Sequence, residues 1–242
     1  VPWTHSERLY QRDDFDLVVE SSRPPATAPQ GKPGNLESAI GRHAAAFVPD
    51  GAVIETGLGT LPDAILRALA DRQGLRLHSG AAGDGVAELM QRGAMTEADC
   101  GLLLGTAKLF EFVHENPRLR LRSTEYTHDP RVLSRIERFV AINSAIEVDL
   151  TGQVNAEVAK GSYMGAVGGA LDFIRAANCS PGGVSIMALP AARVVAKLSG
   201  PVSTPRSEAG VIVTEFGAAD LRGLTLNERR RRMERIAGPR GG

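Results

Sequence analysis

Two glycine-rich turns in this sequence each stand between a short apolar run and a helical pattern. The first is Gly57-Leu58-Gly59, with Pro62 just beyond it, and the second covers residues 165–169, GAVGG. Such a turn places backbone N–H groups at a helix N-terminus, where the partial positive charge favours an anion or a polarised carbonyl oxygen. If both turns face one cleft, they can supply paired donors to an oxyanion. A turn that only lets strand and helix pack is the alternative for the first motif alone.

The other reactive side chains do not indicate serine, nucleotide or metal chemistry. His78-Ser79-Gly80 follows an apolar run but lacks the G-x-S-x-G elbow of a serine hydrolase, and we interpret His78 as structural. A dinucleotide-binding fingerprint would need a third glycine where this chain has Pro62. The other histidines and the two widely separated cysteines show no metal-ligand spacing, so we expect no metal.

Composition limits the possible partners. The chain has 242 residues, a formal net charge of zero, and 43% hydrophobic and 23% charged residues. No broad electrostatic field therefore attracts nucleic acid or an anionic membrane, and no apolar run approaches the roughly 18 residues that span a bilayer. We expect a cytoplasmic protein without nucleic-acid or membrane partners. Because the chain opens in mid-pattern at Val1, we also expect that an upstream part is missing.

Short apolar runs alternate with helical patterns from residue 36 onward, as a parallel sheet with crossover helices requires. Residues 52–54 lead through the first turn into a helix over 61–69, and a second unit has a strand at 75–78, a loop through Gly80 and a helix at 86–91. The remaining expected strands are 102–104, 139–143, 145–150, 184–189 and 211–214, and the remaining expected helices are 108–115, 171–177 and 225–236. The pattern predicts an α/β fold with a mostly parallel sheet flanked by helices.

The run SSRPPATAPQGKPGN at residues 21–35 has almost nothing to bury and is typical of a linker. We therefore expect residues 1–35 to be a linker or the end of a missing N-terminal half, and residues 36–240 to be the compact domain. Glu147 and Asp149 share one face of an expected strand, which favours structural, hydrogen-bonded acids. The arginines at 229–232 are expected to be largely exposed.

A series of ordered segments carries a resemblance to a known family. These segments are GLGTLP at 57–62, LHS at 77–79, DG at 84–85, VAINSAIEVDLTGQV at 140–154, VGG at 167–169, DFIR at 172–175, TEFG at 214–217 and ADLRG at 219–223. Over about residues 36–240 the chain resembles the C-terminal half of the acetyl-CoA hydrolase/transferase family, which includes 4-hydroxybutyrate and succinyl-CoA:acetate CoA-transferases.

The resemblance implies a CoA-transferase-like fold of two similar α/β halves with a CoA thioester bound between them. It implies ping-pong acyl transfer in which a glutamate attacks the thioester and backbone N–H groups stabilise the oxyanion. By motif position, the donors come from Thr56 or Gly57 and from Gly168 or Gly169, and Asn143 orients the thioester.

Gly59 completes the first expected CoA-binding turn, but this sequence departs from the family pattern elsewhere. Gly80 stands where relatives carry the glutamate after the His-Ser pair, Ala170 replaces a glutamine, and Glu55 replaces another glutamine before the first turn. The covalent step cannot occur at a residue without a side chain. An enzyme that uses a different acid, Glu55 or Asp84, is therefore one hypothesis.

The second hypothesis is a pseudoenzyme that keeps the CoA cleft and serves as a binding or scaffold protein. Both hypotheses imply the same ligands, a CoA thioester with a small carboxylate. Both also imply that the N-terminal half of the same fold, or a homo-oligomer, completes the site.

Overall fold

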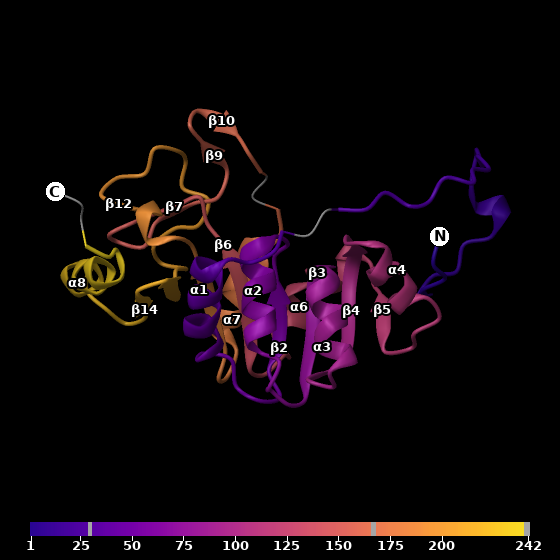
Figure 1. Cartoon of the computed structure of the whole chain (residues 1–242), viewed down its shortest axis with the longest axis horizontal. Coiled ribbons are helices and arrows are strands. Elements are labelled where there is room, and N and C mark those ends of the chain that lie inside the picture. Colours follow the sequence, from indigo (N-terminus) through magenta and orange to yellow (C-terminus); the bar gives the residue numbers. More distant parts are fainter. Residues whose placement is uncertain (29–30, 166–167, 240–242) are drawn as a thin grey trace.

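The computed structural model describes residues 1–28, 31–165 and 168–239, and its centre is one large sheet (Figure 1). Within these residues the sheet has nine strands in the order β1-β5-β4-β3-β2-β6-β11-β13-β14, and only the pair β13 and β14 is antiparallel. The strands are β1 His5–Ser6, β2 Val53–Thr56, β3 Leu75–Ala82, β4 Met95–Leu103, β5 Leu119–Leu121, β6 Phe139–Ser144, β11 Val184–Ala188, β13 Val211–Thr214 and β14 Gly217–Asp220. The predicted α/β fold class, with its mostly parallel sheet, is confirmed.

Helices cover both faces of this sheet. Figure 1 shows α1, α2 and α3 in front of it and α7 behind it. The helices are α1 Asn35–Ala45, α2 Thr60–Ala68, α3 Asp84–Gln91, α4 Ala107–Val113, α5 Thr124–Thr127, α6 Pro130–Leu133, α7 Ala170–Cys179 and α8 Leu226–Ile236, with short 3-10 helices at Arg12–Asp14 and Ala191–Arg193. Two smaller sheets lie outside the main one and contain β7 Glu147–Asp149, β8 Val154–Asn155 and β12 Val194–Val195 in one and β9 Val158–Ala159 and β10 Ser162–Tyr163 in the other.

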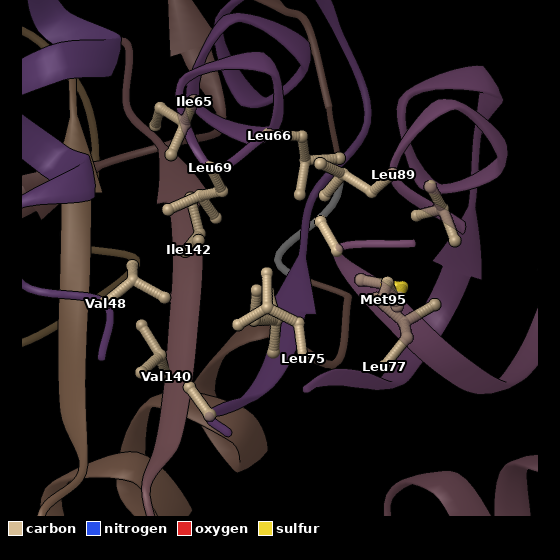
Figure 2. Packing of buried hydrophobic residues seen from close by; sticks show 14 of the residues in the cluster. Val48, Ile65, Leu66, Leu69, Leu75, Leu77, Leu89, Met95, Val140 and Ile142 are labelled. Atoms are coloured by element: carbon tan, nitrogen blue, oxygen red, sulfur yellow. The ribbon is translucent and has the colours of Figure 1, made fainter. Parts of the chain in front are cut away.

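The larger hydrophobic core lies between the sheet and helices α1 to α3. Ile65 of α2 and Leu69, which directly follows this helix, pack with Val140 and Ile142 of β6, as Figure 2 shows, and all four side chains are almost completely buried. Burial of each such side chain contributes about 1.5–3 kcal/mol. The helix begins at the first glycine turn, where Gly59 has a φ of 128°, a conformation that favours glycine. The packing of α2 against β6 and the turn at Gly59 together hold the end of β2 against β6.

The opposite face carries a smaller core beneath α7. Phe173 and Ala177 of this helix pack against Phe139 and Ala141 of β6 and against Val53 of β2. Alternate residues of β2 and β6 therefore serve different cores. Glu55 of β2 and Asn143 of β6 continue the alternation of Val53 and Ala141, so both polar residues lie on the α7 side of the sheet.

Strand β3 is longer than the sequence predicted, and it contains Gly80. The expected loop at this residue was wrong, because β3 remains paired with β4 as far as Ala82, which lies opposite Leu103. Strand β1 pairs with β5 at the edge of the sheet, so the region before residue 35 also contributes to the fold. The division into residues 1–35 and 36–240 stays a prediction. The described residues contain no helix that is long and apolar enough to cross a membrane.

Helix α8 begins after Thr225, whose side chain forms a capping box with Glu228. The expectation that the arginines at 229–232 are largely exposed was wrong for Arg229, which is buried. Its guanidinium donates hydrogen bonds to the carbonyl oxygens of Arg206, at 2.6 Å, and Thr151, at 3.3 Å. Arg229 therefore joins α8 to two loops.

Candidate functional site

A cavity of about 450 Å³ lies at the carboxyl ends of β2, β3 and β6 and at the N-terminus of α7. Its wall includes residues 55–58 from the end of β2, 79–81 from β3, 143–144 from β6 and 168–171 from the second glycine turn and α7. Ligands of open parallel sheets bind outside the carboxyl ends of the strands. The two glycine turns that the sequence singled out therefore meet at a position suited to a ligand.

Strand pairing sets the position of the first turn. Thr56 lies opposite Ile142 in the parallel pair of β2 and β6, and the Gly57 N–H donates to the Ile142 carbonyl at 2.9 Å. A Cβ at Gly57 would lie 3.4 Å from Asn143 Oδ1, so the absence of a side chain lets Asn143 lie against the turn. The Gly57 N–H is thus already engaged within the sheet, and the expectation that Thr56 or Gly57 donates to an oxyanion stays a prediction.

The second turn also requires its glycines. Gly168 has a φ of 55°, in the left-handed region that favours glycine. A Cβ at Gly169 would overlap the imidazole ring of His128. Helix α7 starts immediately afterwards at Ala170, so its N-terminal N–H groups lie at the cavity. Residues 166–167 of this predicted turn lie outside the described residues.

Glu55 is the carboxylate of this cavity, and it is only 4% exposed. Asn143 Nδ2 donates a hydrogen bond to Glu55 Oε2 at 2.8 Å. Burial raises the pKa of the Glu55 carboxyl to about 8, and the Asn143 hydrogen bond offsets this only in part. A carboxyl with such a pKa exchanges its proton near neutral pH, which is a property of acid–base groups in catalytic sites.

His128 and Gly80 face each other in the same cavity. A Cβ at Gly80 would lie 3.3 Å from His128 Cε1 and 3.4 Å from Nε2, so the imidazole occupies the space next to this glycine. The other ring nitrogen, Nδ1, lies 2.9 Å from Thr127 Oγ1. Sequence reasoning considered His128 only as a metal ligand and missed this position, because no local motif marks it.

Gly59 and Asp84 lie outside the cavity. Both belong to the wall of a neighbouring hollow of about 230 Å³. The Asp84 carboxylate accepts hydrogen bonds from the Thr106 backbone N–H at 2.8 Å and from its hydroxyl at 2.6 Å. The two hollows adjoin at Leu58, so the predicted role of Gly59 in CoA binding stays a prediction, whereas the hydrogen bonds of Asp84 join the start of α3 to the start of α4.

The remaining polar residues from the sequence analysis lie in networks elsewhere. His78 Nε2 lies 2.9 Å from the Thr127 carbonyl oxygen, and burial lowers the pKa of this histidine. Glu147 accepts hydrogen bonds from the Ser199 N–H and hydroxyl, each at 2.8 Å. Asp149 accepts from the Thr151 hydroxyl at 2.7 Å. Burial by itself would raise the pKa values of both acids, but hydrogen bonds outweigh this effect and hold the pKa values below their usual range.

The parallel sheet and the cavity at its carboxyl edge define an α/β protein of the CoA-transferase structural class, as comparisons with known proteins show. Residues 105–241 match the acetyl-CoA hydrolase/transferase C-terminal domain. The chain belongs to the acetyl-CoA hydrolase/transferase family. This membership supports an acyl-CoA transferase or hydrolase function at the level of the family.

Individual relatives agree with this assignment. The chain is 36% identical to the 4-hydroxybutyrate coenzyme A transferase of Clostridium kluyveri, over 99% of the chain and 60% of the relative. It superposes with a TM-score of 0.93 on RipA from Yersinia pestis, with 32% identity over 98% of the chain and 58% of RipA. For the 4-hydroxybutyrate CoA-transferase of Porphyromonas gingivalis the TM-score is 0.86 and the identity 32%, over 98% of the chain and 60% of that protein. The chain thus spans about 60% of the length of these relatives.

Proposed function

We propose that this chain is the CoA-thioester-binding domain of an acyl-CoA hydrolase or transferase. The observation that carries the proposal is the single cavity that joins Asn143 to both glycine turns. A thioester carbonyl placed there meets the side-chain amide of Asn143 and the helix N-terminus that follows Gly169. Both groups suit an oxygen that becomes negative when a nucleophile attacks.

Within this proposal, Gly80 occupies the position of the family's nucleophilic glutamate. Gly80 has no side chain that could form an acyl-enzyme, and Ala170 provides no polar group where relatives have glutamine. Covalent transfer through position 80 is therefore absent from this chain. The function that remains is binding of the thioester, with any chemistry left to other groups in the cavity.

A second structural unit is part of the proposal. Because the chain spans about 60% of its relatives, we propose that the N-terminal half of the same fold, or a second copy of the chain, covers the open side of the cavity. The second substrate would be a small carboxylate. No nucleic-acid or membrane partner is proposed.

Calorimetry with CoA and with acetyl-CoA tests the binding proposal. Asn143→Ala should weaken acetyl-CoA binding by roughly 5- to 10-fold, since one hydrogen bond is worth about 1 kcal/mol. Asn227→Ala is the matched control, because Asn227 is exposed on α8, away from the cavity. Absence of heat with both ligands, with the chain alone and with the N-terminal half added, would refute the proposal.

Non-catalytic CoA binding is the second candidate function. The contact between His128 and Gly80 favours it, because a side chain at position 80 would press against the imidazole ring, whose Cε1 lies 3.3 Å from the place of its Cβ. Binding of acetyl-CoA without any release of free CoA thiol would support this candidate. Release of CoA thiol that is lost when a cavity residue is substituted would exclude a non-catalytic function.

A further inference from the structure

Glu55 is a buried acid without a cationic partner. Its side-chain partner is the neutral amide of Asn143, and no ion pair in the described part of the chain involves Glu55. Acids are rarely buried unless a charge is paired with them, because desolvation of the charged form is costly. Glu55 is therefore a buried acid that accepts a hydrogen bond from a neutral amide but has no cation among the described residues to balance its ionised form.

The carboxylate lies on the same side of the sheet as Gly80. Val53 and Ile54 of β2 pair with Arg76 and Leu77 of β3 in parallel register. Because side chains alternate along a strand, Glu55 lies on the α7 side of β2, as Val53 does. By the same alternation Gly80 lies on the α7 side of β3, as Arg76 does. Strand β2 lies between β3 and β6 in the sheet. The Glu55 carboxyl therefore lies between position 80 and Asn143, beside the proposed place of the thioester.

The other candidate acid does not reach this place. Asp84 lies in the walls of different hollows, and Thr106 donates hydrogen bonds to both of its carboxylate oxygens. Of the two acids that the sequence suggested, only Glu55 lines the cavity with the two glycine turns. The structure thus removes an alternative that the sequence left open.

The surroundings of Gly80 favour water as the attacking group. Gly80 offers no nucleophile, and the His128 ring lies directly beside it. A water molecule in the cavity becomes a nucleophile only when a base takes its proton. Glu55 is the carboxylate available for this task. Its pKa of about 8 makes the ionised form a stronger base than an ordinary carboxylate.

We infer that Glu55 is the general base for hydrolysis of a CoA thioester by water, an inference that rests on the proposed function. The Glu55 carboxylate takes a proton from water while the water oxygen bonds to the thioester carbon. The carbon–sulfur bond then breaks, and the Glu55 carboxyl returns the proton to the CoA thiolate. The products are a carboxylic acid and CoA thiol, and water is the only co-substrate.

The experiment compares Glu55→Gln with the wild-type chain and with Glu88→Gln, each alone and with the N-terminal half added. Glu88 is a matched control because its carboxylate forms a partly exposed ion pair with Arg67, away from this cavity. Release of CoA thiol from acetyl-CoA is measured from pH 6 to 10, and binding is measured by calorimetry. The amide is isosteric with the neutral carboxyl that burial favours, and thermal unfolding checks that each variant is folded.

We expect Glu55→Gln to lower kcat by roughly 10²- to 10⁴-fold, the usual contribution of a general base, with little change in acetyl-CoA binding. The wild-type rate should rise with pH through about 8, because only the ionised form accepts a proton. This rise should disappear in Glu55→Gln and persist in Glu88→Gln. Equal rates of CoA-thiol release in Glu55→Gln and wild type would overturn this inference but not the proposed function. Binding of acetyl-CoA without hydrolysis in the wild type would have the same consequence. Absence of binding would overturn the proposed function as well.

Labelled water separates a base from a nucleophile. In a single turnover in H₂¹⁸O, a general base sends the label only into the released acid. If Glu55 instead attacked the thioester, hydrolysis of the resulting anhydride could leave the label in its own side chain. Mass spectrometry of the peptide that contains Glu55 should therefore show no ¹⁸O. Label in this peptide would overturn the role as a base.

Discussion

Glu55 and Asp99 are both shielded acids on neighbouring parts of one sheet, but their surroundings are opposite. Glu55 faces the neutral amide of Asn143, and burial raises its pKa to about 8. Asp99 on β4 accepts hydrogen bonds from Arg120 at 2.8 and 2.7 Å and from Arg122 at 2.8 Å. Although burial opposes it, these guanidinium groups hold the pKa of Asp99 below its usual value.

The comparison shows why the size of a hollow does not identify a site. The hollow around Asp99 has a volume of about 600 Å³, larger than the cavity at Glu55. Its two acids on β4 are paired with arginines, since Arg120 donates not only to Asp99 but also to Glu97 at 2.9 Å. A paired network of this kind connects strands β4 and β5. The smaller cavity contains an acid whose proton can be exchanged, so it is the better candidate for chemistry.

The largest expected effect comes from restoring a carboxylate beside Glu55. With acetyl-CoA and the N-terminal half added, the double variant Gly80→Glu with His128→Asn should form a covalent glutamyl-CoA adduct that mass spectrometry detects. The rate of acetyl-CoA turnover should rise by roughly 10³ or more. Gly80→Glu alone should do less, because the His128 ring must first move. Gly80→Gln with His128→Asn is the control without a nucleophile. A double variant that binds CoA without forming an adduct would show that position 80 is not the nucleophile position.

The pH dependence of stability should separate the two acids. The folded state holds the Glu55 proton up to a pKa of about 8, against 4.5 for the ordinary group. Folded chains therefore bind more protons in this window, and the free energy of unfolding falls as pH rises from 4.5 to 8, by on the order of 3–5 kcal/mol from this group. Urea unfolding of the wild type and of Glu55→Gln measures the effect. An equal pH dependence in both proteins would contradict a raised pKa.

Asp99 should show the opposite behaviour. Its pKa is lowered in the folded state, so its contribution is present above the ordinary value of 3.8 and is lost as pH falls through the folded value. Asp99→Asn should lower the free energy of unfolding by about 1–3 kcal/mol at pH 7, since two arginines lose a charged acceptor. The difference should shrink toward pH 3. Asp71→Asn, at an exposed position, should change little, and a similar loss in both variants would contradict the network.

The smallest expected effect concerns the hydrogen bond to Glu55. Asn143 lowers the pKa of the acid in part, so Asn143→Ala should move the pKa of Glu55 further upward. One hydrogen bond of about 1 kcal/mol corresponds to a shift of roughly 0.5–1 unit. The midpoint of the pH-dependent stability change reports this shift independently of activity. A downward shift would show that another group replaces the amide.

The sequence by itself predicted the strand–turn–helix units that begin at residues 52 and 75 and the later strand and helix at 184–189 and 225–236, but it did not predict α1, β5 or β14. Glycines with special backbone angles mark the turns, as at Gly59 and Gly168, and apolar periodicity marks the helices. The capping box of Thr225 and Glu228 likewise places the start of α8 by a local rule. Family membership was also predictable, because many ordered segments carried it. The continuation of β3 through Gly80 to Ala82 was not predictable, because pairing with β4 extends this strand beyond its apolar run.

Only the tertiary structure decided which residues share the cavity. Glu55 and Asn143 are 88 residues apart in the sequence, and the parallel register of β2 with β6 brings them into contact. Gly59, the N-cap residue of α2, lines the neighbouring hollow and not this cavity, although it is only two residues from Gly57. The raised pKa of Glu55 likewise depends on burial by distant segments. Local sequence specifies turns and periodicity, whereas contact between strands and exclusion of water depend on how the whole chain packs.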